Sequence, residues 1–491
     1  MKKSILFICL LFVQGISFSQ TMEIFADVRG GDAVKINSES TIIGDLVFSP
    51  IANNQSISVT NLKTKTRIEK KVFDLNSKIH NLSNLRNNYR NLIVISRGRL
   101  VEGNVQFLIQ SMGKDDKVNL TRTTLDDELN VVNEILILSY DLAHTQITGP
   151  VRTDRIFKYD EQLKMYFYGE YYSVPRAEDF LQTVIFNSEM EMTAQNSFNL
   201  KNKDTELDPL KGFSYIPTSN IIDAETVVIN IQGSLFRIKN KEFTPIPLEL
   251  KKTIRSYVIH SNGEGGIRFV GCYAEDKENQ GLAVIDFDGE MNVKFEKFQN
   301  IPQELHATQK ELTGFGNTAK LKDRTLNVKD FKVNKNGSTD IVLYLENFIY
   351  LNFSFLKIDE QAKIIDKLVV PFSTDLVSSY DLIFDKEKII IMTEDNEKWF
   401  DRNGEFSAKT YPNRKSDNFI LTAIIVPSEN FGSYTRKEVL IGDTSLKNYN
   451  TKSQKLSFYN LKLEDGSYLM NFGEGSYRFG FKALYLGKIQ F

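Results

Sequence analysis

Residues 281–298 read GLAVIDFDGEMNVKFEKF, in which the acidic segment DFDGE separates two apolar runs. The first run is almost continuously apolar, and the second alternates apolar and polar side chains. An Asp-Gly pair between two such runs is the strongest local signal for a β-hairpin, because a type I′ turn needs positive φ at both central residues. The segment therefore predicts a hairpin with Asp288 and Gly289 as its central residues.

The same device recurs along the chain. Asn-Gly or Asp-Gly pairs stand at 262–263, 336–337, 403–404 and 465–466. Short runs rich in Val, Ile, Phe and Tyr have the length and composition of strands. They lie at 105–110, 134–141, 165–172, 226–231, 340–348 and 388–395. Together these patterns predict an all-β protein built from hairpins.

The spacing of the hairpins indicates a repeat. Points where an apolar strand meets a polar turn and a second strand lie near 61–65, 141–145, 187–190, 238–241, 286–290, 358–361 and 400–404, with another between 440 and 466. Most neighbouring intervals are about 40 to 50 residues, the length of one four-stranded propeller blade. Two intervals are longer, and each has room for an insertion or a degenerate repeat.

This layout resembles β-propeller proteins, and more loosely the uncharacterised exported propeller-like proteins of Gram-negative bacteria, over most of residues 25–491. No blade carries a WD dipeptide, a kelch double glycine or another family signature at matching positions. The resemblance implies a single propeller of about seven four-stranded antiparallel blades, with six or eight also compatible, and insertions near 73–92 and 301–335. The strand-like segment 467–491 is expected to pair within a sheet, in a ring-closing blade with N-terminal sequence.

The N-terminus predicts export. Lys2 and Lys3 precede an apolar run from Ile5 to Val13, and the small residues Ser17 and Ser19 precede Gln20. This is the pattern of a cleaved signal peptide over residues 1–19, which leaves 20–491 as the propeller domain. The apolar run is shorter than the ~20 residues that span a bilayer. We therefore predict a protein of the periplasm, cell surface or medium, without a membrane span.

The charge balance argues against a nucleic-acid partner. The chain has 61 Lys plus Arg and 63 Asp plus Glu, and without Lys2 and Lys3 the balance is 59 against 63, a net charge of −4. The charges are dispersed, with no basic block that would attract a phosphate backbone. An envelope protein or an extracellular glycan is the partner class that we expect.

Few residues suggest catalytic chemistry. Sequence motifs for metalloproteases, serine hydrolases and phosphate-binding loops are absent. Without Cys9, which lies in the predicted signal peptide, Cys272 is the only thiol. We interpret it as a packed small hydrophobe, against the alternative of a nucleophile. His144, His260 and His306 could be gathered by the fold, although nothing in the sequence requires it. Trp399, the single Trp, is predicted to pack in the core in preference to forming a sugar platform.

Calcium is the one cofactor for which the sequence offers a candidate site. Asp286, Asp288 and Glu290 alternate, and hard cations prefer clustered carboxylates. An EF-hand loop begun at Asp286 would need glycine at its sixth position and an acid at its twelfth, where Met291 and Lys297 stand. Two interpretations stay open: a structural hairpin, and a cation held by Asp286 and Glu290 in another geometry.

From these observations we predict a non-enzymatic binding or interaction scaffold, with no assigned catalytic residue. The alternative is a propeller hydrolase or lyase that acts on an extracellular polysaccharide. That alternative requires histidines and carboxylates to converge on a common point. A second alternative is a subunit of an envelope complex, which predicts a contiguous exposed apolar patch.

Overall fold

The computed structural model describes the chain between Gln20 and Phe491 in segments. These are residues 20–29, 40–51, 56–64, 66–71, 93–94, 98–112, 117–141, 152–160, 163–173, 179–199, 219–231, 234–246, 252–262, 265–274, 280–307, 311–312, 325–347, 349–371, 380–396, 419–441, 454–463, 465–476 and 480–491. The predicted signal peptide, the segment 73–92, His144, Trp399 and the pair 403–404 lie outside them.

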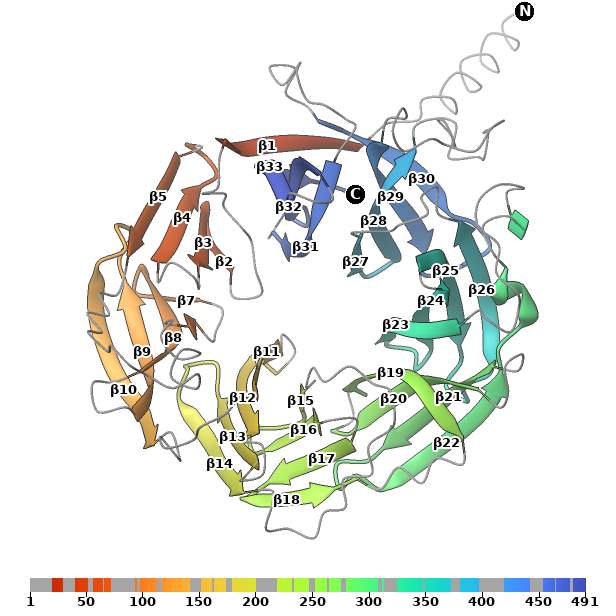
Figure 1. Cartoon of the computed structure of the whole chain (residues 1–491), viewed down its shortest axis with the longest axis horizontal. Coiled ribbons are helices and arrows are strands. Elements are labelled where there is room, and N and C mark those ends of the chain that lie inside the picture. Colours follow the sequence, from red (N-terminus) through yellow and green to blue (C-terminus); the bar gives the residue numbers. More distant parts are fainter. Residues whose placement is uncertain are drawn as a thin grey trace, which may run out of the picture.

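The described strands form seven hydrogen-bonded sheets around a ring (Figure 1). Three of the four-stranded antiparallel sheets come from the first half of the chain. They contain β2 (Thr41–Ile43), β3 (Leu46–Ile51), β4 (Ser56–Asn61) and β5 (Thr66–Lys71); β11 (Arg152–Asp160), β12 (Met165–Ser173), β13 (Asp179–Phe186) and β14 (Met192–Asn199); and β15 (Ser219–Ile221), β16 (Thr226–Ile231), β17 (Ser234–Lys239) and β18 (Glu242–Pro245).

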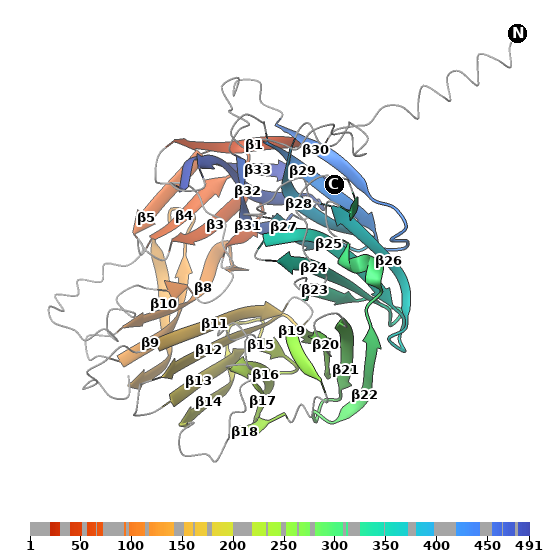
Figure 2. The same ribbon diagram turned by 45° about the vertical axis from the view of Figure 1, so that its right-hand side comes forward.

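Two further four-stranded sheets follow, and Figure 2 brings them forward. They contain β19 (Thr253–Ser261), β20 (Ile267–Ala274), β21 (Gln280–Phe287) and β22 (Val293–Asn300); and β23 (Thr325–Val333), β24 (Thr339–Asn347), β25 (Ile349–Ile358) and β26 (Ile364–Pro371). A five-stranded sheet contains β6 (Ile93–Val94), β7 (Arg99–Val101), β8 (Asn104–Met112), β9 (Lys117–Leu125) and β10 (Val131–Asp141).

The seventh sheet has eight strands and consists of two four-stranded units. A short parallel pairing of β1 with β30, Gln20 to Met22 against Val439 to Ile441, joins the units. One unit contains β27 (Tyr380–Phe384), β28 (Lys388–Asn396), β29 (Phe419–Pro427) and β30 (Thr435–Ile441). The other contains β31 (Gln454–Lys462), β32 (Tyr468–Ser476), β33 (Gly480–Ile489) and β1 (Gln20–Arg29).

The predicted β-propeller of about seven blades is confirmed. The described strands make seven sheets, and dividing the eight-stranded sheet at the β1–β30 pairing gives eight units, seven of four strands and one of five, so both counts fall within the predicted range. The expected closure is confirmed as well, because β1 pairs antiparallel with the C-terminal strand β33, from Met22↔Ile489 to Arg29↔Ala483. The first strand of each unit lies nearest the centre of the ring (Figure 1).

The hydrophobic core lies between neighbouring units. Between the β19–β22 and β23–β26 units, Val270 and Leu282 pack with Leu326 and Leu343, all of them fully buried. The other pairs of neighbours are joined in the same way, including the two units of the eight-stranded sheet. Because each such side chain gains roughly 1.5–3 kcal/mol on burial, packing between units holds the ring together.

The turns correct one prediction. Asp288 and Gly289 are not the two central residues of a type I′ turn. Asp288 N–H donates to the Asn292 carbonyl oxygen (3.0 Å), Met291 N–H donates to the Asp288 carbonyl oxygen (3.0 Å), and Met291 has φ 65°. The hairpin is there, but Met291 takes the left-handed conformation. Burial of the Met291 side chain compensates for that strain, which local sequence signals do not reveal.

This turn recurs between the last two strands of other units. Leu129, Met190 and Ala362 also have positive φ and are also buried, within the turns 126–130, 187–191 and 359–363. In the turns at 334–338 and 463–467, Gly337 and Gly466 take that position, each with φ 80°. The Asn336-Gly337 and Asp465-Gly466 pairs therefore do form hairpins, with only the glycine in the left-handed region.

Among the described residues near 301–335 are one turn of 3₁₀-helix, Gln303–His306, and the strand β23, which begins at Thr325. No helix among the described residues is long and apolar enough to cross a membrane.

Candidate functional site

The three acids of DFDGE have separate partners. Asp286, on β21, forms a two-pronged ion pair with Arg268 on β20, with Nε–Oδ1 2.7 Å and Nη2–Oδ2 2.6 Å. The Arg268 Nη1 also donates to Thr339 Oγ1 in the next unit. Such planar, paired hydrogen bonds are the strong form of an Arg–carboxylate contact. Asp286 therefore belongs to a buried pair that links the second and third strands of its own unit to the next one.

Asp288 caps its turn. Its Oδ1 accepts hydrogen bonds from the backbone N–H groups of Glu290 and Asn292, each at 2.9 Å. The bond from Asn292 is the main reason that the pKa of Asp288 lies below its usual range. The carboxylate acts here as a turn-forming side chain, which is a common role for Asp in loops.

Glu290 reaches back to the preceding unit. Its carboxylate accepts hydrogen bonds from Arg237 Nη2 (2.5 Å) and Lys239 Nζ (3.2 Å), both on β17. The bond from Arg237 is the largest cause of the lowered pKa of Glu290. Within the described part of the chain, no three His, Cys, Asp or Glu side chains are grouped so as to hold a metal ion. A cation at Asp286 and Glu290 stays a prediction.

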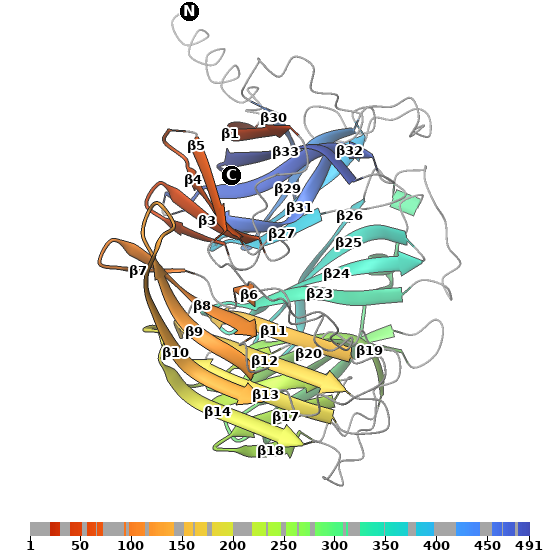
Figure 3. The same ribbon diagram turned by 60° about the vertical axis from the view of Figure 1, so that its left-hand side comes forward.

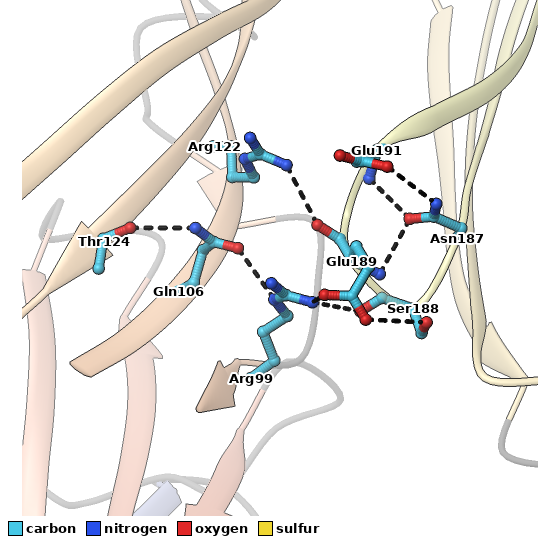
Figure 4. Close-up of polar contacts among 8 residues, drawn as sticks. All are labelled: Arg99, Gln106, Arg122, Thr124, Asn187, Ser188, Glu189 and Glu191. Atoms are coloured by element: carbon cyan, nitrogen blue, oxygen red, sulfur yellow. Dashed lines mark hydrogen bonds and ion pairs between the residues drawn. The ribbon is translucent and has the colours of Figure 1, made fainter. Parts of the chain in front are cut away.

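A second link of this kind joins the five-stranded sheet to the β11–β14 unit (Figure 4). Arg99, on β7, pairs with the Glu189 carboxylate and donates to the Ser188 carbonyl oxygen (2.9 Å). Arg122, on β9, donates to the Glu189 carbonyl oxygen (3.2 Å). Glu189 occupies the same position in its turn as Glu290. The recurrence at two junctions indicates a structural role for both glutamates.

Two side chains of inner strands form a hydrogen-bonded pair. His260, on β19, and Asp330, on β23, come from neighbouring units, and Nε2 lies 2.6 Å from Oδ1. The Phe331 ring packs against the imidazole, with centroids 4.7 Å apart. Both side chains keep more than a third of their surface exposed, 37% and 36%. The pair is therefore held in place and still open to a partner.

Lys158 is a cation on which the charge of Asp330 acts. It lies on β11, where Nζ donates to the Ser219 carbonyl oxygen (2.9 Å) and to Asn220 Oδ1 (2.8 Å). Burial lowers the pKa of Lys158, and the carboxylates of Asp160 and Asp330 oppose that effect. The charge of Asp330 thus acts on a lysine from a different unit. We call Lys158, His260 and Asp330 the axial cluster.

Of the two predicted histidines that the structure describes, His260 lies in this cluster and His306 does not. His306 is buried in the 3₁₀-helix, which packs on β26, the outer strand of its unit. Cys272 is fully buried, and burial raises the pKa of its thiol to about 12, so the prediction of a packed hydrophobe is supported. Sequence analysis missed Lys158 and Asp330. Their strands, RTDRIFKYD and TLNVKDFKV, each carry several other charged residues, so the sequence does not set these two apart from solvent-facing charges.

A second buried ion pair lies between the β23–β26 unit and the next. Asp340 is fully buried, and its Oδ1 lies 3.4 Å from Lys357 Nζ. The Lys357 ammonium donates to the Ser428 carbonyl oxygen and lies over the Phe431 ring, 5.1 Å from its centroid. Among the described residues, neither Asp340 oxygen accepts a hydrogen bond. This pair is an internal packing feature with no exposed group.

No family model matches the chain, and no curated protein matches it in sequence. Among solved structures, the WD40 domain of SCAP from fission yeast is similar with a TM-score of 0.38 and 9% identity, over 95% of this chain and 98% of that one. Puromycin hydrolase aligns with a TM-score of 0.35 and 8% identity, over 93% of this chain and 62% of that one.

A GH43 β-1,3-galactosidase with galactodeoxynojirimycin aligns with a TM-score of 0.27 and 10% identity, over 75% and 93% of the two chains. At such scores the likenesses carry no functional argument. The assignment of the propeller fold rests on the strand order and pairing described above.

Proposed function

We propose that the protein is an exported, non-enzymatic binding scaffold, which takes its ligand at the axial cluster. One observation carries the proposal: His260 and Asp330, from the inner strands of neighbouring units, pair at 2.6 Å while both stay more than a third exposed, and the charge of Asp330 also acts on Lys158 of a third unit. A rigid ring that presents side chains from several strands is a common basis for binding. Export is inferred from residues 1–19 alone.

The cluster favours a polar ligand. It offers an ammonium at Lys158, a carboxylate at Asp330 and an imidazole at His260, so it can both donate and accept hydrogen bonds. An extracellular glycan or a polar segment of an envelope protein would meet these groups. His260 and Asp330 are the groups to expect in contact, because Lys158 Nζ already has two protein acceptors.

Affinity capture from envelope extracts tests this proposal. We expect the wild-type protein to recover a glycan or a protein. The double variant His260→Ala/Asp330→Ala should recover at least tenfold less of it. A control variant, Lys363→Ala, removes an exposed charge in an outer turn and should recover as much as the wild type.

Two outcomes would contradict the proposal. Equal recovery by the wild type and the double variant would place binding elsewhere. Turnover of an extracellular polysaccharide that His260→Ala abolishes would instead assign the hydrolase or lyase alternative, since the His260–Asp330 pair has the geometry of an oriented general base.

A further inference from the structure

β10 has an unusual place in the ring. It is the outermost strand of the five-stranded sheet, and among the described strands it is hydrogen-bonded to β9 only (Figure 3). With eleven residues it is long for an outer strand. A free strand edge carries unpaired backbone N–H and C=O groups, which can pair with another strand.

The side chains of β10 do not protect that edge. Val131, Val132, Ile135 and Leu136 are 45%, 56%, 39% and 58% exposed. Glu134 is the only charged residue from 131 to 140. Native proteins usually place charges, particularly Lys, on free edges. The outer strand β5 follows that rule, with the sequence TRIEKK. The outer strand β22 follows it too, with VKFEKFQN.

We propose that β10 is a dimerisation edge, at which it pairs antiparallel with β10 of a second copy of this chain. In such a pair the two-fold axis is normal to the sheet, so each contact occurs twice. Register shifts against β9 divide the strand into two regular stretches, Asn133–Leu136 and Leu138–Asp141, and the exposed Ile135 and Leu136 lie in the first. Centring the axis on Ile135 places Ile135 opposite its own copy and Glu134 opposite Leu136. The alternative centre at Glu134 would oppose two carboxylates, which is unfavourable.

The composition of this edge favours a second copy as the occupant, because a strand that is mostly apolar, with Glu134 as its one carboxylate between 131 and 140, can pair with itself without opposing like charges. The chain carries a net charge of −2, or −4 without the predicted signal peptide, so two copies repel each other weakly. Pairing along one strand edge buries less than the standard interface of about 1,600 Å². The dimer is therefore weak and depends on concentration.

Cross-linking at the two-fold axis tests the geometry. The variant Ile135→Cys places a thiol next to its own copy, so mild oxidation should give a covalent dimer on a non-reducing gel. The matched control Ile68→Cys, with a 51% exposed residue on β5, should give at least tenfold less. Both variants contain the same buried Cys272, so the difference between them reports the position of the new thiol. Equal cross-linking of the two would overturn the proposal.

Light scattering over a concentration series tests the assembly itself. The wild type should move from the mass of one chain towards two. Leu136→Lys should stay at one chain, and Ile68→Lys should behave as the wild type. A wild type that stays monomeric at its highest soluble concentration would overturn the proposal and leave the edge to a different partner. So would a mass beyond two chains, or a dimer that Leu136→Lys leaves intact. If Leu136→Lys fails to fold, the cross-linking comparison still decides.

Discussion

The β19–β22 and β23–β26 units carry an ion pair at the same place with the charges exchanged. Arg268 on β20 lies opposite Asp286 on β21, and this pair is directly next to the Ile267↔Phe287 pair at the end of the two strands. Asp340 on β24 lies opposite Lys357 on β25, and this pair is directly next to the equivalent Thr339↔Ile358 pair. In each unit the pair lies between the second and third strands, and the cation also contacts the following unit.

The two pairs differ in how well they are satisfied. The planar guanidinium of Arg268 meets both oxygens of Asp286 and still donates to Thr339. The Lys357 ammonium is a compact point charge that donates to the Ser428 carbonyl oxygen, and no described residue donates a hydrogen bond to the oxygens of Asp340. An arginine can therefore donate to both oxygens of a buried carboxylate and to a further acceptor, whereas a lysine in the same place does not, because the guanidinium is a planar fork and the ammonium is a compact point charge.

Removing the arginine should have the largest effect. Arg268→Met leaves Asp286 partly buried beside apolar surface, with no cation in the pair. We expect the free energy of unfolding to fall by about 3–5 kcal/mol, the usual result of breaking a buried pair. Urea unfolding followed by circular dichroism measures it. Lys363→Met, which removes an exposed charge in the neighbouring unit, should change it by less than about 0.5 kcal/mol. A loss for Arg268→Met no larger than that of this control would show that the pair contributes little.

Replacing both residues of each pair should change the free energy of unfolding differently for the two pairs. For Asp340→Leu/Lys357→Met, we expect an unfolding free energy that is unchanged or raised by about 1–4 kcal/mol, because a poorly satisfied buried pair often contributes less than apolar packing. Arg268→Met/Asp286→Leu should remain less stable than the wild type, since the interaction with Thr339 is lost as well. Equal changes in the two double variants would mean that the difference in hydrogen bonding has no energetic consequence.

The turns should give the smallest change in stability, and one that depends on pH. The folded-state pKa of Asp288 is lowered, so its ionised form stabilises the fold above the unfolded-state pKa, near 3.9. That contribution is lost as the pH falls through the folded-state value. Asp288→Asn keeps the accepting Oδ1 and removes the titration, so its stability should fall less steeply below pH 4 than that of the wild type.

The turn at 187–191 supplies the reciprocal variant. Asn187 already accepts the same two backbone hydrogen bonds, from Glu189 and Glu191, each at 2.9 Å. Asn187→Asp should therefore make stability at this turn more dependent on pH in acid. Thermal unfolding between pH 2.5 and 6 follows both variants, and parallel curves for all three proteins would exclude titration at the turns.

Much of the fold could be predicted from the sequence, because strands and hairpins are local. The run at 226–231 coincides with β16, and the pairing of the C-terminal strand with N-terminal sequence was expected. The turn type at Asp288 was not predictable, because Met291 takes the left-handed conformation only where a neighbouring unit covers its side chain. The Asp-Gly pair predicts a turn type only from the backbone preferences of its two residues.

The axial cluster was beyond sequence analysis for a different reason. His260 was named among the candidates, but Asp330 is 70 residues away along the chain and Lys158 is farther still. Their proximity depends on how units pack around the ring. Without that packing, a Lys or Asp inside a strand is indistinguishable from an ordinary solvent-facing charge.

The pairing of β1 with β33 has a consequence for the order of synthesis. The first strand to be made pairs with the last, so β1 has no antiparallel neighbour until residues 480–489 have been synthesised. Until then, Val47 and Leu62 also lack the contact with Leu469 and Leu486 that buries them. Closing so long a loop is slow compared with forming hairpins, because long-range pairing carries the larger entropic cost. We therefore expect ring closure to be the late step of folding, and unfinished chains to be the form most exposed to aggregation and proteolysis.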